Sequence, residues 1–184
     1  MGVKVVTGKA RMSYANVFEP KSINGSDPKY SVSVLIPKSD KATLKKIQDG
    51  IEAAIEDGKT KLADKSGKIN KAVLKLPLRD GDTERPDDPV YAGHYFVNAN
   101  ASESYPPKVF DAALNPIMDR NEFYSGCYAR ASLTFYAFSA SGNKGIAAGL
   151  NGLQKVADGE PLGGGGNVEA DFDDDFEIED DILG

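Results

Sequence analysis

The chain has little of the chemistry on which most catalytic and metal sites depend. Its 184 residues include one cysteine, Cys127, one histidine, His94, and no tryptophan. A single cysteine excludes an internal disulfide and a multi-cysteine zinc cluster, and a single histidine leaves only one possible base for a Ser-His-Asp triad. The HExxH, CxxC, GxxxxGK[ST] and GxGxxG motifs are also missing. We therefore predict that the protein is not an enzyme and has no cofactor and no metal site.

Long apolar runs are missing as well. No stretch approaches the roughly 20 apolar residues that a membrane-spanning helix needs. The first residues, MGVKVVTGKARMSY, contain no apolar core followed by a small-residue cleavage site. We expect a cytoplasmic protein without a membrane partner, and its length fits one domain, since domains typically span roughly 100–200 residues.

Charges of the two signs are distributed unevenly along the chain. All 22 lysines and arginines lie before Gly163, whereas nine of the 28 acidic residues lie in a tail that ends DFDDDFEIEDDILG. The body therefore carries 22 basic against 19 acidic residues, a net charge of +3. Such an asymmetry is associated with proteins that bind nucleic acids, and a solubilising tail on an ordinary domain is the alternative.

The acidic tail follows a run of four glycines at positions 163–166. Its like charges repel one another and its few apolar side chains cannot offset the ordering entropy, so we expect disorder in isolation. The glycines make a flexible tether. We divide the chain into a domain of residues 1–162 and a linker with tail of residues 163–184. Four apolar tail residues are suited to a partner protein: Phe172, Phe176, Ile182 and Leu183.

Alternating apolar and polar residues predict several strands. Residues 3–18 are rich in β-branched and aromatic types and predict one long first strand, and residues 29–36, KYSVSVLI, alternate strictly. Residues 127–138, CYARASLTFYAF, form the clearest strand, and Ser141-Gly142-Asn143 turns it back into a hairpin with residues 144–150. HYFVNA and PPKVFDA predict two shorter strands.

One amphipathic helix is expected after the second strand. Apolar residues recur at helical spacing from Leu44 to Ile55, behind a cap at Ser39 or Asp40, and the pattern ends at Gly58. Strands with Gly-marked bends and a single helix predict a mainly β (α+β) fold. We expect a partly open antiparallel barrel that resembles the oligonucleotide/oligosaccharide-binding (OB) fold, with the helix packed against it.

Residues 76–91, LPLRDGDTERPDDPVY, predict a loop that holds the only acidic cluster outside the tail. Its carboxylates are Asp80, Asp82, Glu84, Asp87 and Asp88. Such a group could bind Mg²⁺ or Ca²⁺ through oxygen ligands, as a metal-dependent nuclease would require. The spacing is not that of an EF-hand, and Arg79 and Arg85 interleave the acids. We interpret the segment as a turn with local ion pairs.

Cations alternate with aromatic rings in the two strongest strands, which favours a single-strand binder that tracks phosphates and stacks bases. On residues 127–138, one strand face carries Tyr128, Arg130 and Tyr136. Lys9 and Arg11 point opposite to Tyr14 on a regular strand, so a bulge is needed to unite them. Packing across the sheet is the alternative for each tyrosine. Including cations from residues 29–36 and the basic stretch 59–79, the predicted nucleic-acid contacts are Lys9, Arg11, Tyr14, Lys29, Lys75, Arg79, Tyr128, Arg130 and Tyr136.

Long stretches of the chain resemble a family of phage single-stranded DNA-binding proteins. The resemblance is carried by the acidic end and by SYANVFEPKSINGSDPKYSVSVLIPKSD, PLRDGDTERPDDPVYAGHYFVNANA and EFYSGCYARASLTFYAFSASGNKGIAAGLNGLQKVADGEPLGG. It implies an OB fold and cooperative cover of single strands during phage replication or recombination. It also implies an acidic C-terminus that regulates binding or recruits replication proteins. The final Ile182-Leu183-Gly184 departs from the terminal Phe of bacterial single-strand binders.

Three classes of function are left open by the sequence, and the third is a metal-dependent nuclease that would use the carboxylates of residues 80–88. In the first, the protein binds single-stranded DNA without sequence specificity, and its tail competes with DNA or recruits replication and recombination proteins. In the second, it is a protein-interaction or DNA-mimic module whose tail imitates phosphate and whose body binds no nucleic acid. The oligomeric state is also open, a homo-oligomer included.

Overall fold

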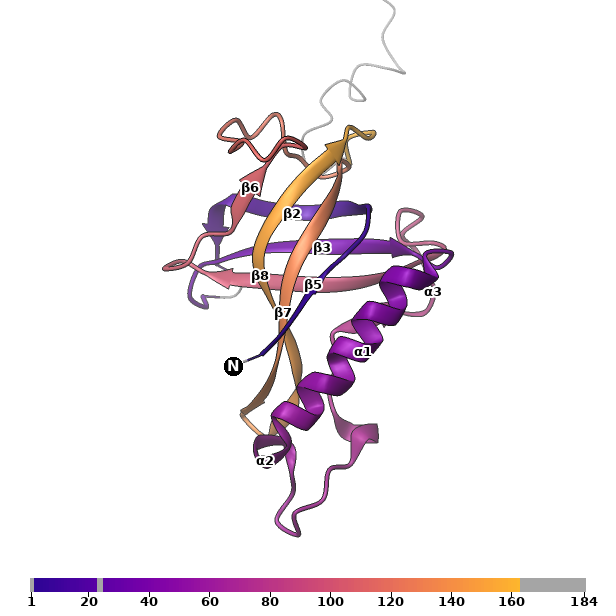
Figure 1. Ribbon diagram of the computed structural model, residues 1–184, viewed down its shortest axis with the longest axis vertical. Coiled ribbons are helices and arrows are strands. Elements are labelled where there is room, and N and C mark those ends of the chain that lie inside the picture. The colour runs from indigo at the N-terminus through magenta and orange to yellow at the C-terminus, as the bar shows by residue number, and fades with distance from the viewer. Residues whose placement is uncertain (1, 23–24, 163–184) are drawn as a thin grey trace, which may run out of the picture.

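The computed structural model describes residues 2–22 and 25–162, which form a mainly β fold (Figure 1). Eight strands join in one sheet in the order β1-β7-β2-β3-β5-β8-β6, with β4 paired to β5. Their bounds are β1 (Val3–Val6), β2 (Ala10–Lys21), β3 (Lys29–Pro37), β4 (Leu78–Asp80), β5 (His94–Ser102), β6 (Lys108–Phe110), β7 (Tyr128–Ala140) and β8 (Asn143–Ala157). The predicted mainly β fold is confirmed.

The sheet closes on itself because β7 and β8 also pair with each other. The strands that close the barrel are β7, β2, β3, β5 and β8. Two of the pairings between these strands are short. β2 meets β7 at two residue pairs, and β5 meets β8 at the single pair Asn100 and Gly149. The barrel is therefore partly open, as predicted, but the β5–β8 and β6–β8 pairs are parallel rather than antiparallel.

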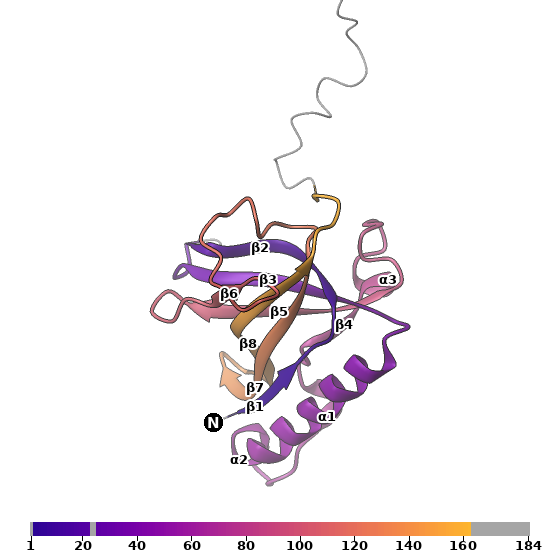
Figure 2. The same cartoon turned by 45° about the horizontal axis from the view of Figure 1, so that its top comes forward.

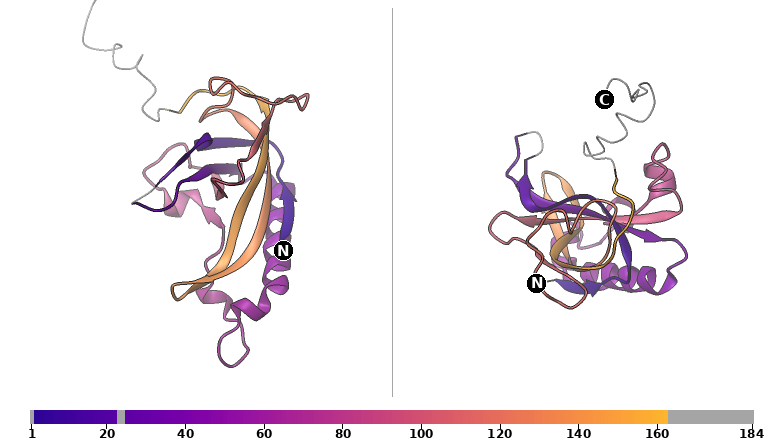
Figure 3. Two further views of the ribbon diagram at one scale, coloured as in Figure 1. Left: turned by 90° about the vertical axis from the view of Figure 1, so that its left-hand side faces the viewer. Right: turned by 90° about the horizontal axis from the view of Figure 1, so that it is seen from above.

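Two sets of strands cross within the barrel. Figures 1 and 3 show β2, β3 and β5 side by side, running across the long β7–β8 hairpin. Alternate residues of each strand point into the space between the two sets, where Val34, Val97, Leu133 and Phe135 are fully buried. The other face of β2, β3 and β5 points outward.

The expected first strand of residues 3–18 is wrong, because the chain changes partner after β1. Thr7 donates its backbone N–H to the carbonyl of Ala131 on β7, and Gly8 donates its own to the Thr43 hydroxyl. From Ala10 onward the chain pairs mainly with β3. A uniformly β-rich sequence gives no signal for this exchange, because both halves have the composition of a strand.

The predicted amphipathic helix is confirmed as α1 (Lys41–Asp57). The Asp40 side chain accepts the N–H of Thr43 and caps its first turn, and Gly58 follows its last. Its buried side packs on β1 and β7 so closely that a Cβ at Gly50 would lie 2.5 Å from Val5 Cγ2. No helix in the described residues is long and apolar enough to cross a membrane.

The segment predicted as a loop, residues 76–91, contains two short elements. β4 pairs with β5, and α3 (Gly81–Glu84) follows at once, capped by the side chain of Asp80. A Cβ at Gly81 would lie 2.4 Å from the carbonyl oxygen of Tyr91, so the segment folds tightly back on itself. The remaining short helices are α2 (Lys59–Leu62) and a 3-10 turn at Lys71–Val73.

Candidate nucleic-acid interface

The outward side of β2, β3 and β5 carries rows of side chains that run across the strands. Directly opposed residues of an antiparallel pair point to the same face. The first row crosses five strands and comprises Tyr128, Arg11, Leu35, Phe96 and Arg79. Three of the predicted contact residues, far apart in sequence, therefore lie in one line.

The next rows are almost entirely polar. They are Ser13, Ser33 and Asn98; then Asn16, Ser31 and Asn100; then Lys21, Lys29 and Ser102. We call these three rows and the first row the outer face. The opposite sides of β3 and β5 are apolar and buried. On the outer face, Ser13 and Ser33 are also buried, so the exposed polar part of this face lies at Asn98 and in the rows of Asn100 and Lys29. Asn98 and Asn100, which the sequence analysis did not select, are exposed and offer amide donors and acceptors.

Tyr14 reaches the outer face through a bulge, as the sequence required. The β2–β3 register shifts between Ser13 and Asn16, so that Tyr14 and Ala15 together oppose one residue of β3. Tyr14 has a φ of 47°, in the left-handed region, and is 57% exposed. The Asn16 side chain donates to the carbonyl of Tyr14, and Ala15 donates its N–H to Ser125 Oγ.

Lys9, Arg11 and Tyr128 form a cluster at one end of the first row, which we call the cationic cluster. Lys9 Nζ lies 4.9 Å from the Tyr128 ring centroid and Arg11 Cζ lies 5.9 Å from it. Two donors of Arg11 already bind backbone carbonyls, at Gly126 (3.3 Å) and Glu160 (2.7 Å). Arg11 thus ties the last described residues to β2 while its charge stays beside the ring.

The other predicted contacts lie away from the outer face or at its margin. Arg130 follows Tyr128 along β7, and its Nε donates to the carbonyl of Thr7. Tyr136 lies eight residues further along β7 than Tyr128, a separation of about 26 Å at the rise of a strand. Lys75 bridges to Gly145 of the β7–β8 hairpin, near α2 at the opposite end of the molecule from the exit of the tail (Figure 1).

A small second core fixes residues 81–93 over one end of the outer face. Leu35, Phe96 and Tyr91 pack together, and the rings of Tyr91 and Phe96 meet edge to face at 5.0 Å. The Tyr91 hydroxyl donates to Ser33 Oγ at 3.1 Å. Beside this core lies Arg85, which the sequence analysis treated only as a neutralising charge.

Ion pairs hold three acids of this segment, so the predicted turn with local ion pairs is confirmed only in part: Glu84 has a local partner, whereas Asp80 and Asp82 pair with Lys38 outside residues 76–91. Lys38 Nζ lies 2.8 Å from Asp80 Oδ1 and 2.7 Å from Asp82 Oδ2. Hydrogen bonds from Lys38 hold the pKa of both carboxyls below the ordinary value, and the carboxylates raise the pKa of Lys38. Arg79 pairs with Glu84. Across residues 2–22 and 25–162, no group of three or more His, Cys, Asp or Glu is placed to hold a metal ion.

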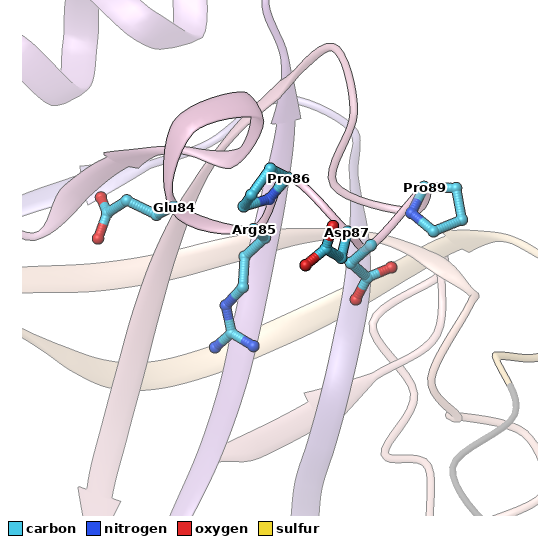
Figure 4. Close-up of a pocket in the computed structure, with 6 residues that line it drawn as sticks. Glu84, Arg85, Pro86, Asp87 and Pro89 are labelled. Atoms are coloured by element: carbon cyan, nitrogen blue, oxygen red, sulfur yellow. The ribbon is translucent and has the colours of Figure 1, made fainter.

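A shallow hollow of about 390 Å³ lies at the turn after α3. It is lined by Glu84, Arg85, Pro86, Asp87, Asp88 and Pro89. Figure 4 shows that Arg85 extends away from the acidic side chains on either side of it. The Arg85 guanidinium therefore does not fill the hollow.

The last described residues, which precede the linker and tail, are anchored beside the cationic cluster. The Tyr124 hydroxyl binds Asp158, Lys155 Nζ lies 2.6 Å from the Asp158 carboxylate, and Leu162 donates its N–H to the carbonyl of Ser125. The chain leaves the body next to β2 (Figure 2). The predicted tail residues Phe172, Phe176, Ile182 and Leu183 lie outside the described residues, as does the segment beyond the proposed domain boundary at residue 162.

Comparison with known proteins relates this geometry to a family. A family model described as the ssDNA-binding protein of Enterobacter phage Enc34 matches residues 3–183. A curated relative, putative protein p50 of Acyrthosiphon pisum secondary endosymbiont phage 1, is 33% identical over 180 residues and 94% of each chain is covered.

Solved structures agree with the family model. The single-stranded DNA-binding protein of bacteriophage Enc34, in complex with ssDNA, is 28% identical with a TM-score of 0.72, covering 87% of this chain and 89% of that chain. The fold is also shared with gp2.5, the single-stranded DNA-binding protein of bacteriophage T7, at 13% identity and a TM-score of 0.57, covering 97% and 100% of the two chains. These matches are DNA-binding proteins and not enzymes. The chain belongs to the phage single-stranded DNA-binding protein family typified by that of Enterobacter phage Enc34.

Proposed function

We propose that the protein binds single-stranded DNA without sequence specificity during phage DNA replication or recombination in the cytoplasm of an infected bacterium. The observation that carries the proposal is the outer face, a polar and cationic surface on three strands of a small barrel. OB folds bind oligonucleotides on such a strand face. The family adds support, because a relative in it is named as a single-stranded DNA-binding protein and has been solved with ssDNA.

The outer face offers each interaction that sequence-tolerant binding needs. Lys9 and Arg11 at one end and Lys29 at the other lie about 20 Å apart along the strands, and they can attract successive phosphates. Tyr14 offers an exposed ring for base stacking between them. Asn98 and Asn100 can donate to or accept from whichever base edge or sugar lies above them. None of these contacts requires a particular base.

The proposal is tested by measuring how the affinity for a fluorescent single-stranded oligonucleotide depends on salt. If the protein engages about six phosphates, log K plotted against log salt should have a slope near −4, from about −0.7 per phosphate. A slope near zero, or tighter binding to duplex, would contradict the proposal. No binding at all would favour a DNA-mimic or protein-interaction module, and strand cleavage on adding Mg²⁺ would indicate a nuclease.

Two tyrosines of β7 distinguish between the surfaces that DNA could follow. We expect Tyr128→Ala to weaken binding by about 1–3 kcal/mol, because Tyr128 holds the cationic cluster and offers a ring at the outer face. Tyr136→Ala should change the affinity less than twofold, because Tyr136 lies about 26 Å away along β7. Equal losses from both variants, with both still folded by circular dichroism, would instead place DNA along β7.

We further propose that the acidic tail competes with DNA for the body and, when DNA displaces it, recruits replication or recombination proteins. The support for competition is electrostatic. Nine carboxylates follow a glycine tether, and the tether begins beside the cationic cluster, so their effective concentration there is high. The support for recruitment is the set of apolar side chains among those acids: Phe172, Phe176, Ile182 and Leu183.

Deleting residues 167–184 should tighten single-strand binding, and the gain should be larger at low salt, where screening is weakest. The matched control keeps the tail composition but scrambles its order. Wild-type affinity in the scrambled protein would mean that charge alone accounts for the competition. Unchanged affinity of the truncated protein at low salt would show that the tail does not compete with DNA.

A further inference from the structure

Arg85 is surrounded by aromatic rings. Its guanidinium carbon lies 5.3 Å from the ring centroid of Tyr91 and 5.9 Å from those of Tyr14 and Phe96. Tyr91 and Phe96 are each 1% exposed and belong to the small second core, so they are fixed in place. Tyr14 is the exception, because more than half of it faces solvent. The guanidinium is therefore held between a buried aromatic pair and an open ring.

The hydrogen-bonding capacity of Arg85 is not used by its own segment. Arginine carries five N–H donors, yet among the contacts of the described residues its guanidinium makes no hydrogen bond and no ion pair. Two of the neighbouring acids are engaged elsewhere: Glu84 binds Arg79, and Asp88 accepts the N–H of Val90. Asp87 lines the same hollow but makes no ion pair with Arg85 among the described residues. Figure 4 shows the Arg85 side chain directed away from Glu84 and Asp87. An arginine held by cation–π contacts alone keeps its donors for an anion.

Tyr14 is presented to this arginine by an unusual backbone conformation. A positive φ is uncommon for a large side chain, and such residues concentrate at functional sites when the surroundings hold them. Here the Asn16 amide and the Ser125 hydroxyl hold the backbone on either side of the bulge. A regular strand would have placed the ring differently and left Arg85 without its exposed aromatic neighbour.

We propose that Tyr14 and Arg85 together form a nucleotide-binding subsite, in which one base stacks on the open face of the Tyr14 ring and the Arg85 guanidinium donates to the adjacent phosphate. The subsite deepens the proposed function and rests on it. Tyr91 and Phe96 orient the planar guanidinium before DNA arrives, so little side-chain freedom is lost on binding, and a planar fork can donate two parallel hydrogen bonds to one phosphate. Lysine at this position would keep the charge without the fork.

The stacking half of the subsite has a direct optical test, because the chain contains no tryptophan. Tyr14→Trp introduces a single indole, whose fluorescence should be quenched when a thymidine oligonucleotide stacks on it. The matched control is Val73→Trp, at a position that is 70% exposed on the 3-10 turn far from the outer face. We expect no quenching in the control. Normal DNA binding by Tyr14→Trp with unchanged fluorescence would overturn the stacking role.

The phosphate half is tested with Arg85→Gln, Arg85→Lys and, as control, Arg120→Gln, which removes an exposed arginine paired with Glu19. Arg85→Gln should weaken binding about tenfold and make the salt slope about 0.7 shallower, the value of one phosphate. Arg85→Lys should restore the slope but not the full affinity. The control should match the wild type in both.

Each outcome separates the subsite from the proposed function. If the wild type does not bind single strands, the proposed function fails. If the wild type binds but Arg85→Gln keeps its affinity and slope, the subsite is wrong. If Arg85→Gln lowers the affinity and the melting temperature while the slope stays at the wild-type value, Arg85 only covers the small second core, and the proposal is overturned.

Discussion

The alternation of side chains along β3 and β5 is the constraint on which the rest of the structure depends. Every second residue enters the barrel core, so its neighbours must face outward. Those neighbours are mostly Ser, Asn and Lys, which tolerate water and can bind a polar ligand. Where the outward row becomes apolar, at Leu35 and Phe96, a cover is required. Residues 81–93 supply it through Tyr91, and this same cover brings Arg85 to the edge of the exposed polar rows.

Closure of the barrel then decides which distant residues become neighbours. β7 pairs with β1, β2 and β8, and its short contact with β2 sets Tyr128 beside Arg11. The same contact brings the end of the described chain back to β2, where Arg11 binds the carbonyl of Glu160. One end of the outer face therefore combines cations, a ring and the last described residues before the acidic tail. The proposed attraction of DNA and the proposed competition between DNA and the tail both depend on this single strand junction.

Long elements with a repeating pattern of apolar residues could be predicted from the sequence. Features that arise only when the barrel closes could not. The alternation in residues 29–36, the helical spacing from Leu44 to Ile55 and the strand at residues 127–138 each carry enough repeats to specify an element. The break at Thr7 and Gly8 carries no pattern, because it is a change of partner. Likewise, the sequence showed that Tyr14 could share a strand face with Lys9 and Arg11 only through a bulge. It could not place Arg85 beside Tyr14, because the two residues are 71 positions apart and are brought together by the packing of Tyr91. The sequence showed that Tyr128 and Tyr136 lie on the same face of one strand. It could not show that only Tyr128 lies where β7 pairs with β2.

The central claim is that single-stranded DNA lies on the outer face of β2, β3 and β5. It is tested most directly by following the backbone amide signals of isotopically labelled protein during titration with a short thymidine oligonucleotide. The account predicts that the largest shifts fall on Ser31, Asn98 and Asn100, with small shifts at Ser132 and Thr134 on the outward side of β7. Large shifts at Ser132 and Thr134, with none on β3 and β5, would contradict it.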